Sequence, residues 1–438
     1  MFHSRQVDDT LSVDVAFRAS HICFASTLTT FDFAMKEKNT DEEVENLTLA
    51  ERPFLGRITK DEDLMGEALV VPVIHTNPQG VAGSGLSTAQ TNETNVAGKK
   101  FTATVGDYFG SVSIGGKVLK LSRGNPGAFL QNKLAETDGL YEQMADSLAT
   151  YLWGNGGGAL GQIAAGGITS ETATLTNKSD AMNFEVGQVV VSSENDGSDA
   201  AHTLQTGSTY VTSVDRTAGT VTFEDISDMD SIDAGDYLFR QGDFFGNTGV
   251  VVLKGVQAYI ASSDTPADLY GMVRTSDPTR LAGCRVASGD LTAKNIEERL
   301  RILGSKMSGT YKAKGPWEGY LHPEDWQILE TSLQARGIRP LKDDSTRFGY
   351  MKIQMVVGGQ TVDFFVDRFA PRGTAFLLRM KNWKLHSAGK MIAPVSGDGL
   401  TMLRKSTTND YEFRLESYLI NMCNAPGYNG RVALPTAA

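Results

Sequence analysis

The most constraining feature of this sequence is one long amphipathic stretch, NPGAFLQNKLAETDGLYEQMADSLATYLWGN, at residues 125–155. Asn125 is a typical helix cap, Pro126 suits the first helical position, and Gly154 ends the pattern. Apolar residues recur at helical spacing on one face, with charged residues opposite: Leu130, Leu134, Tyr141, Met144, Leu148 and Tyr151 against Lys133, Glu136, Glu142 and Asp146. A helix of about 28 residues would be about 42 Å long, well beyond the usual length of about 11 to 12 residues. The fold must therefore be built around a long helical spine.

Before this helix the sequence predicts a long β-hairpin with a polar tip. The segment EALVVPVIH, beginning at Glu67, is rich in β-branched residues, and KKFTATVGDYF, beginning at Lys99, alternates apolar and polar residues like a returning strand. Between them, NPQGVAGSGLSTAQTNETN at residues 77–95 has almost nothing to bury. With about 10 to 15 residues in each arm, the tip would lie about 40 Å from its base. Because an isolated two-stranded ribbon is barely stable in water, we expect it to lie on a surface that it does not itself supply.

An acidic module follows the helix. Residues 178–236 hold twelve acidic and two basic residues, a net charge of −10 out of −11 for the chain, so the other 379 residues are close to neutral. Short alternating segments, including GQVVVSS and STYVTSVDRTAGTVTFED, predict strands joined by Gly and Asp turns. This pattern predicts a small β-barrel or sandwich inserted into another domain. Nucleic-acid binding is disfavoured there because it requires clustered Lys and Arg.

The remaining segments predict helices and strands, and the chain as a whole is predicted to be α+β. LTAKNIEERLRILGSKM and HPEDWQILETSLQARG predict helices, and YMKIQMVVGGQTVDFFVDRF predicts a hairpin that turns at Gly358 and Gly359. YEFRLESYLI, beginning at Tyr411, predicts a strand. A chain of 438 residues exceeds what one core usually organises, so two or three modules are expected.

Cysteine usage and hydropathy favour a protein made and folded in a cytosol, with no membrane contact. Cys23, Cys284 and Cys423 are odd in number and far apart, which disfavours a disulfide framework, and we interpret them as small buried residues. The first twenty residues include Asp8, Asp9 and Asp14 where a signal peptide needs an apolar run. No stretch approaches the apolar length of a membrane span.

The glycine-rich stretches do not match nucleotide-binding motifs. In SVSIGGKV, Ser111 stands where a P-loop needs its first glycine, and Val118 stands where it needs Ser or Thr. Gly83 and Gly85 are followed by Thr88 in place of the third glycine of a dinucleotide fingerprint, and a polar coil is expected after it instead of a helix.

No local motif for a metal or a catalytic site emerges either, and no cofactor is predicted. The six histidines are scattered without metal-ligand spacing: His3, His21, His75, His202, His322 and His386. SENDGSD, at residues 192–198, superficially suggests calcium but lacks the complete spacing of an EF-hand loop. The acids of the module are interpreted as solvated surface groups. Trp383, beside basic residues, could stack on a nucleic-acid base, but core packing is favoured.

Several segments taken in order resemble the major capsid proteins of tailed bacteriophages with the Hong Kong 97-like fold. They are the hairpin with its polar tip, the spine helix, GYLHPEDWQILE, RGTAFLLRMKNWKLHSAG and YEFRLESYLINMCNAPGYNG. The resemblance covers about residues 45–160 and 246–435. It implies an N-terminal arm at 1–55, an extended loop at 56–123, a peripheral domain at 124–160 and 396–438, the acidic β-rich insertion domain at 161–245, and an axial domain at 246–395.

The resemblance also implies a function. The chain would be a structural, non-catalytic protein that assembles with itself as hexamers and pentamers into the icosahedral head of a virion in a bacterial host cytoplasm. It would enclose double-stranded DNA without sequence-specific binding and would meet a portal protein. The extended-loop residues expected to contact a neighbouring subunit are Asn77, Gln79, Gly80, Gly83, Gly85, Asn92, Lys99 and Lys100. Some relatives crosslink a loop lysine to an asparagine, but no partner asparagine is specified here.

Two departures from the family pattern carry further expectations. The first fifty residues are too few for a scaffold carried on the same chain, so a separate scaffolding protein is expected. The acidic insertion is absent from the minimal fold, and we expect it to face outward and to dock a decoration protein or a host glycan. Three rival functions stay open: an encapsulin that encloses an enzyme cargo, a surface adhesin or glycan-binding protein built around the β-module, and a hydrolase whose site converges from distant residues.

Overall fold

The computed structural model describes residues 52–116, 126–250, 252–286, 295–335, 353–395 and 402–435. The chain divides into two units, Met1–Glu51 and Arg52–Ala438, and the described residues belong to the second. The predicted first part of the N-terminal arm, Cys23, Asn125 and Val118 lie outside the described residues. The described part is of mixed α and β structure, as predicted.

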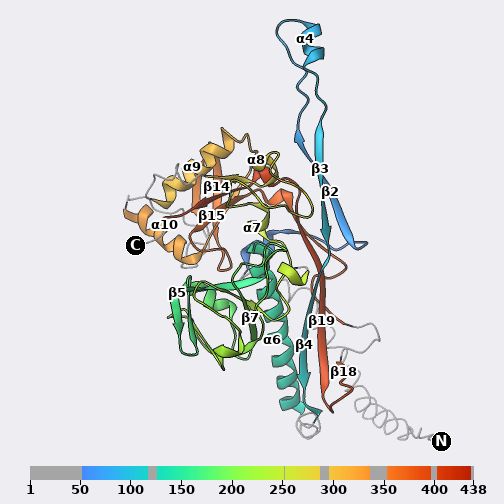
Figure 1. Cartoon of the computed structure of the whole chain (residues 1–438), viewed down its shortest axis with the longest axis vertical. Helices are drawn as coiled ribbons and strands as arrows, with labels where there is room; N and C mark the ends of the chain where they lie inside the picture. Colours follow the sequence, from blue (N-terminus) through green and yellow to red (C-terminus); the bar gives the residue numbers. More distant parts are fainter. Residues whose placement is uncertain are drawn as a thin grey trace, which may run out of the picture. The chain divides into compact units, whose positions relative to one another are not determined.

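The predicted hairpin is confirmed as a two-stranded antiparallel ribbon of β2 (Ala68–Thr76) and β3 (Ala97–Thr104). Its register places Ala68 opposite Thr104 and Ile74 opposite Gly98. A short helix, α4 (Leu86–Thr91), lies in the loop that joins the two strands (Figure 1). The returning strand is shorter than predicted, because Val105 separates β3 from a second strand, β4 (Gly106–Ile114), which pairs elsewhere.

The spine helix is confirmed as α6, which extends over 28 residues from Pro126 to Trp153. It lies alongside β4 and the long strand β19 (Figure 1). Gly110 of β4 makes this approach possible, since a Cβ there would lie 3.2 Å from Leu140 Cδ1. Tyr141 and Phe413 pack with their ring centroids 6.2 Å apart. The predicted apolar face is buried from Tyr141 onward, and the side chains of Leu130 and Leu134 lie outside the described residues.

The sheet beneath α6 is centred on β19, which covers the predicted final strand. β19 pairs antiparallel with β4, β16, β17 and β18, and β1 adds to β16 in parallel. The bounds are β1 Thr59–Asp61, β16 Trp383–Ser387, β17 Ala393–Pro394, β18 Met402–Arg404 and β19 Tyr411–Cys423. Segments from both ends of the predicted loop 56–123 therefore belong to this sheet.

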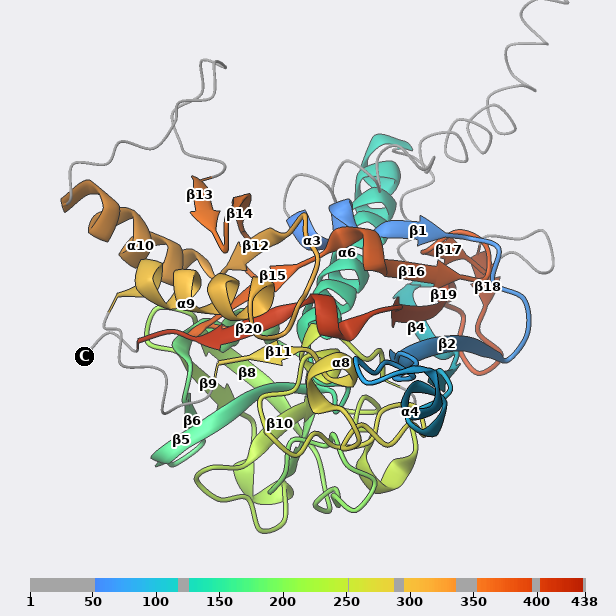
Figure 2. The same ribbon diagram turned by 90° about the horizontal axis from the view of Figure 1, so that it is seen from above.

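A second six-stranded sheet has the order β11-β20-β15-β12-β14-β13, and Figure 2 shows α9 and α10 along one side of it. The predicted hairpin turn at Gly358 and Gly359 is confirmed, and both glycines have positive φ, at 60° and 80°. The bounds are α9 Ile296–Ser308, α10 Pro323–Ala335, β11 Cys284–Arg285, β12 Glu318–Leu321, β13 Ile353–Val357, β14 Gln360–Val366, β15 Thr374–Leu378 and β20 Gly430–Ala433. Leu300, Leu303 and Met307 of α9 are fully buried against this sheet.

The acidic module is a closed barrel of six strands in the order β10-β5-β6-β9-β8-β7. The bounds are β5 Ala159–Thr169, β6 Thr172–Leu175, β7 Val189–Ser193, β8 Thr209–Asp215, β9 Thr220–Phe223 and β10 Tyr237–Arg240. It has its own apolar interior, in which Ile163, Val190, Val221 and Leu238 are almost completely buried. Because β10 pairs with β5, the barrel begins and ends at neighbouring positions, with Phe239 opposite Ala159.

An aromatic cluster joins the two sheets, α6 and the first described helix, α3 (Pro53–Arg57). The Phe54 ring lies 4.7 Å from Trp153, 5.6 Å from Tyr320 and 6.0 Å from Trp383, measured between centroids. Trp383 is fully buried, so the core interpretation of this residue is confirmed. Cys284 and Cys423 are also buried, as predicted, and burial raises the pKa of each thiol to about 12.

Candidate functional site

The ribbon of β2 and β3 has one face that packs against its own chain. Val73, His75, Phe101 and Ala103 are buried on this face. Phe101 meets Tyr259 edge to face, with centroids 6.0 Å apart, and Tyr259 ends the short helix α7 (Val256–Tyr259). The lower part of the ribbon is therefore held by the segment that follows the barrel.

The opposite face of the ribbon is exposed, and its β2 half is apolar. Val70, Pro72 and Ile74 follow one another along this face of β2, and Ile74 is 67% exposed. Across the ribbon, Lys100 lies opposite Pro72, and Gly98, which has no side chain, lies opposite Ile74. Branched apolar side chains on a solvent-facing ribbon are unfavourable unless another surface covers them.

The tip of the ribbon, residues 77–96, continues this exposed apolar character. Val81 is 81% exposed and Leu86 is 75% exposed, and Val96 is half-exposed. The helix α4 buries none of its residues. A six-residue helix without a buried face gains little from its own chain, since isolated helices of this length are unstable in water.

The structure brings six of the eight predicted contact residues together at the tip. Asn77, Gln79, Gly80, Gly83, Gly85 and Asn92 are all exposed there. Gly85 has a φ of 125° and precedes α4, so the polar coil predicted after the two glycines is wrong. The sequence LSTAQT has no apolar face that would have predicted a helix.

The other two predicted residues, Lys99 and Lys100, lie on β3, below the tip. Lys99 Nζ donates hydrogen bonds to the carbonyl oxygen of Val273 at 2.5 Å and to Ser276 Oγ at 2.8 Å, within its own chain. Lys100 is exposed on the apolar outer face. The predicted set names polar tip residues and omits the apolar Ile74 and Leu86. The signal for Ile74 is the uninterrupted apolar run of β2, ALVVPVI, because such a run places apolar side chains on both faces of a strand.

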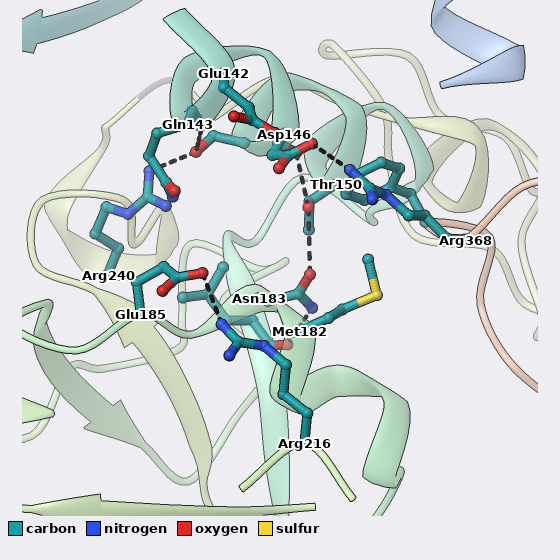
Figure 3. Close-up of a pocket in the computed structure, with 13 residues that line it drawn as sticks. Glu142, Gln143, Asp146, Thr150, Met182, Asn183, Glu185, Arg216, Arg240 and Arg368 are labelled. Carbon is teal, nitrogen blue, oxygen red and sulfur yellow. Dashed lines mark hydrogen bonds and ion pairs between the residues drawn. The ribbon is translucent and has the colours of Figure 1, made fainter. Parts of the chain in front are cut away.

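A second candidate site is a cavity of about 450 Å³ between α6, the barrel and the segment at Arg368 (Figure 3). On the barrel side, Arg216 Nη2 donates to Glu185 Oε1 at 2.7 Å. On the α6 side, Asp146 Oδ1 accepts hydrogen bonds from Arg52 Nε at 2.7 Å and from Arg368 Nη2 at 3.0 Å. Each of these carboxylates is therefore held in an ion pair.

The contacts that cross this cavity are few and polar. Arg240 Nη1 donates to Ser147 Oγ at 2.8 Å, and Thr150 Oγ1 lies 3.4 Å from Asn183 Oδ1. The described residues that line the cavity include neither histidine nor cysteine. The arrangement is a hydrogen-bonded contact between α6 and the barrel, in which Ser147 accepts from Arg240 and Asp146 is paired with arginines.

The calcium alternative finds no support in the described residues. Asp196, in the SENDGSD segment, accepts hydrogen bonds at Oδ1 from Ser198 and at Oδ2 from Asn155 Nδ2, the latter at 2.8 Å. Its carboxylate therefore organises the local loop. No group of three or more His, Cys, Asp or Glu residues in the described part of the chain could hold a metal ion.

No described helix is both long enough and apolar enough to cross a membrane.

No protein-family model matches this sequence, and no curated protein matches it. Solved structures do resemble it. The cyanophage A-1(L) capsid asymmetric unit is 12% identical with a TM-score of 0.46, covering 88% of this chain and 93% of that chain. The phage G gp27 major capsid protein with gp26 decoration proteins is 7% identical with a TM-score of 0.39, covering 86% and 88%.

An encapsulin, the holo-SrpI complex from Synechococcus elongatus PCC 7942, is 9% identical with a TM-score of 0.39, covering 86% of this chain and 84% of that chain.

Proposed function

We propose that this chain is the major capsid protein of a tailed double-stranded DNA bacteriophage, a structural and non-catalytic subunit of an icosahedral head. The observation that carries the proposal is the exposed apolar band of the ribbon and its tip, which includes Ile74, Val81 and Leu86. A long ribbon with one face anchored on its own chain and the other face apolar is suited to lie on a second copy. Covering each such side chain would contribute about 1.5 to 3 kcal/mol before the cost of ordering.

Contacts of this modest strength can stabilise a shell because each is repeated in every subunit. Each copy both offers a ribbon and receives one, so the contacts close around rings of five or six subunits and their free energies add. The exposed glycines of the tip, such as Gly83, let the backbone conform to neighbours at slightly different angles. Hexamers and pentamers of one chain require that adaptability.

The proposal includes a division of the chain in the manner of the Hong Kong 97-like fold. Residues 1–55 would be the N-terminal arm and 56–123 the extended loop. The peripheral domain would comprise 124–160 and 396–438, built on α6 and β19, and the axial domain would be 246–395. The barrel would be an insertion domain at 161–245. The separate interior of the barrel supports this last assignment.

The same proposal extends to partners. A portal protein and a separate scaffolding protein would take part in assembly in the host cytoplasm. The acidic barrel would face outward, away from DNA phosphates, because residues 178–236 carry a net charge of −10. There it would be available to a decoration protein with a basic surface. Electron microscopy that placed the barrel against the packaged DNA would overturn this part.

The test is the assembly of ribbon variants. Ile74→Asp and Leu86→Asp, alone and together, place carboxylates in the band that a neighbour would cover. We expect the double variant to remain folded by circular dichroism but to form no closed shells in negative-stain microscopy, whereas the unaltered chain forms them. Val356→Asp is the matched control, because Val356 is also 67% exposed but lies on β13, away from the ribbon.

Two results would contradict the proposal. One is an unaltered chain that stays monomeric at every concentration and salt tested, with or without a coexpressed scaffold. The other is equal assembly by the ribbon variants and the control. Shells that enclose an enzyme cargo in place of nuclease-protected DNA would favour the encapsulin alternative.

A further inference from the structure

The outer face of the ribbon combines an apolar strand with a single charge. Its residues are Ala68, Val70, Pro72 and Ile74 of β2 and Gly98, Lys100, Thr102 and Thr104 of β3. Lys100 is the only charged residue in this set, and its exposed side chain has no hydrogen bond or ion pair within the described residues. A surface that covers this face must therefore be apolar at its centre and must offer a negative charge.

A face with these properties lies on the sheet of β4 and β19, on the side away from α6. Gly110 faces α6, because a Cβ there would lie 3.2 Å from Leu140 Cδ1, so its neighbour Phe109 faces the other way. Phe109 is 64% exposed, more than any other aromatic side chain in the described part of the chain. Its ring meets Tyr418 of β19 edge to face, with the centroids 5.8 Å apart. An aromatic pair on an open sheet face gains stability when another surface covers it.

Two carboxylates adjoin this aromatic pair, and together the four residues make up what we call the β4–β19 face. Glu416 lies directly opposite Phe109, and Asp107 lies directly opposite Tyr418. Neither carboxylate has a basic partner among the described residues. Directly opposed residues lie about 5 Å apart and alternate residues of one strand about 7 Å apart, so a cation placed over the Phe109 ring can reach both. The β4–β19 face is thus apolar at its centre and negative around it, which complements the ribbon.

The ribbon of the same copy cannot cover this face. Only Val105 separates β3 from β4, and Figure 1 shows the two strands extending end to end, so the ribbon leads away from Phe109. A second copy must supply the covering ribbon. Because the ribbon and the β4–β19 face are different surfaces, the contact is heterologous, and heterologous contacts close into rings when the rotation between copies permits.

We propose that the ribbon of one copy lies across the β4–β19 face of the next copy, with Pro72 over the ring of Phe109. Lys100, which lies directly opposite Pro72 on the ribbon, is then placed between the two carboxylates. The inference rests on the proposed function and identifies the surface that receives the ribbon. The apolar contact supplies affinity, and the charges set the position at which the ribbon stops along the face.

The first test is charge reversal in the full-length chain. Lys100→Glu adds a third carboxylate between two others and is expected to lower the yield of shells at least about tenfold, because like charges repel across an interface. Asp107→Lys combined with Glu416→Lys should lower the yield similarly. The triple variant restores opposite charges and is expected to recover the yield of the unaltered chain to within about threefold.

Lys314→Glu is the control for this test, because Lys314 is another exposed lysine and lies outside the ribbon. It is expected to leave the yield of shells within about twofold of the unaltered chain. Circular dichroism of the unassembled variants shows whether each remains folded.

Crosslinking supplies a second readout that does not depend on charge. Chains with Thr102→Cys, on the outer face of the ribbon, are coexpressed with chains that carry Ser111→Cys, two residues beyond Phe109 on β4. We expect a short bismaleimide to join the two variants in mixed shells and to give no more dimer in shells of either variant alone than in shells of the unaltered chain. Thr102→Cys mixed with Val356→Cys is the control and should also stay at that level.

Normal shell yields from both charge-reversed chains overturn the inference, as does a triple variant that assembles no better than either of them. Mixed shells that do not crosslink above the control also overturn it. In each case the shells of the unaltered chain leave the proposed function standing. An unaltered chain that forms no shells is a failure of the proposed function, and the inference falls with it.

Discussion

The surroundings of Asp180 differ from what its sequence neighbourhood predicts. The acids of the barrel were expected at the surface, yet Asp180 lies behind Gly161 and Phe184, where burial raises its pKa to about 7. A hydrogen bond from Asn177 Nδ2 and the positive charge of Arg372 oppose this shift without cancelling it. A count of acidic residues identifies neither Asp180, in the 3₁₀ turn Lys178–Asn183, nor Asp236, which is only 5% exposed, so the prediction that the acids of this module are solvated is wrong for both.

This burial makes stability depend on pH in a defined direction. An aspartate of the unfolded chain releases its proton near pH 4, whereas folded Asp180 holds its proton up to about pH 7. The folded state therefore binds more protons in this window, and the free energy of unfolding falls as pH rises from about 4 to about 7. We expect Asp180→Asn to match the unaltered chain near pH 4 and to be about 2 to 4 kcal/mol more stable at pH 8.

Urea denaturation of the unassembled protein at several pH values measures this difference. Asp230→Asn is the control, since Asp230 is exposed in the same barrel. A stability difference between Asp180→Asn and the unaltered chain that stays constant from pH 4 to pH 8 would contradict the interpretation.

At the scale of elements, α3 shows how a segment too short to be stable alone is fixed by what it contacts. Five residues cannot sustain a helix in water. The Phe54 side chain is buried among Trp153, Tyr320 and Trp383, and its backbone N–H donates to Asp367 Oδ2 at 3.1 Å.

Phe54→Ala is expected to lower the free energy of unfolding by about 3 to 5 kcal/mol, because it removes a ring from a closed aromatic cluster. Tryptophan fluorescence during urea denaturation follows this loss, since Trp153 and Trp383 border the cavity it would create. Met65→Ala, at a side chain that is 88% exposed, should change stability by no more than about 0.5 kcal/mol. A loss as small as that for Phe54→Ala would mean that α3 is held in another way.

The elements that could be predicted are those with a strong local pattern. α6 combines a long 3.6-residue repeat with proline and glycine at its ends, and the hairpin at Gly358 and Gly359 combines alternation with a glycine turn. By contrast, α4 has no apolar periodicity, and β4 separates from β3 at Val105 only because β19 provides another partner. The sequence locates the tip of the ribbon, but only the structure shows that the apolar residues of the tip are exposed.

At the scale of the whole molecule, we expect the rest of the chain to fold without the barrel. It has a separate apolar interior, and Phe239 opposite Ala159 brings its two ends together. Its contact with α6 includes the hydrogen bond from Arg240 to Ser147 and contains the cavity of about 450 Å³. An interface that mixes polar contacts with unfilled space is typical of domains that fold separately.

The last prediction follows from this independence and from the charge of the barrel. We expect a chain in which residues 159–240 are replaced by a short Gly-Ser linker to fold, provided that Phe244, which packs on Phe239, is changed to Ser. The excised residues carry nearly all of the net charge of −11. If the barrel lies on the outside of a shell, shells of the excised chain should migrate much more slowly toward the anode in native agarose than shells of the unaltered chain. Charge enclosed within a shell contributes little to its electrophoretic mobility, so equal migration of the two kinds of shell would place the barrel inside. An insoluble excised chain would show that α6 requires the barrel as a packing partner.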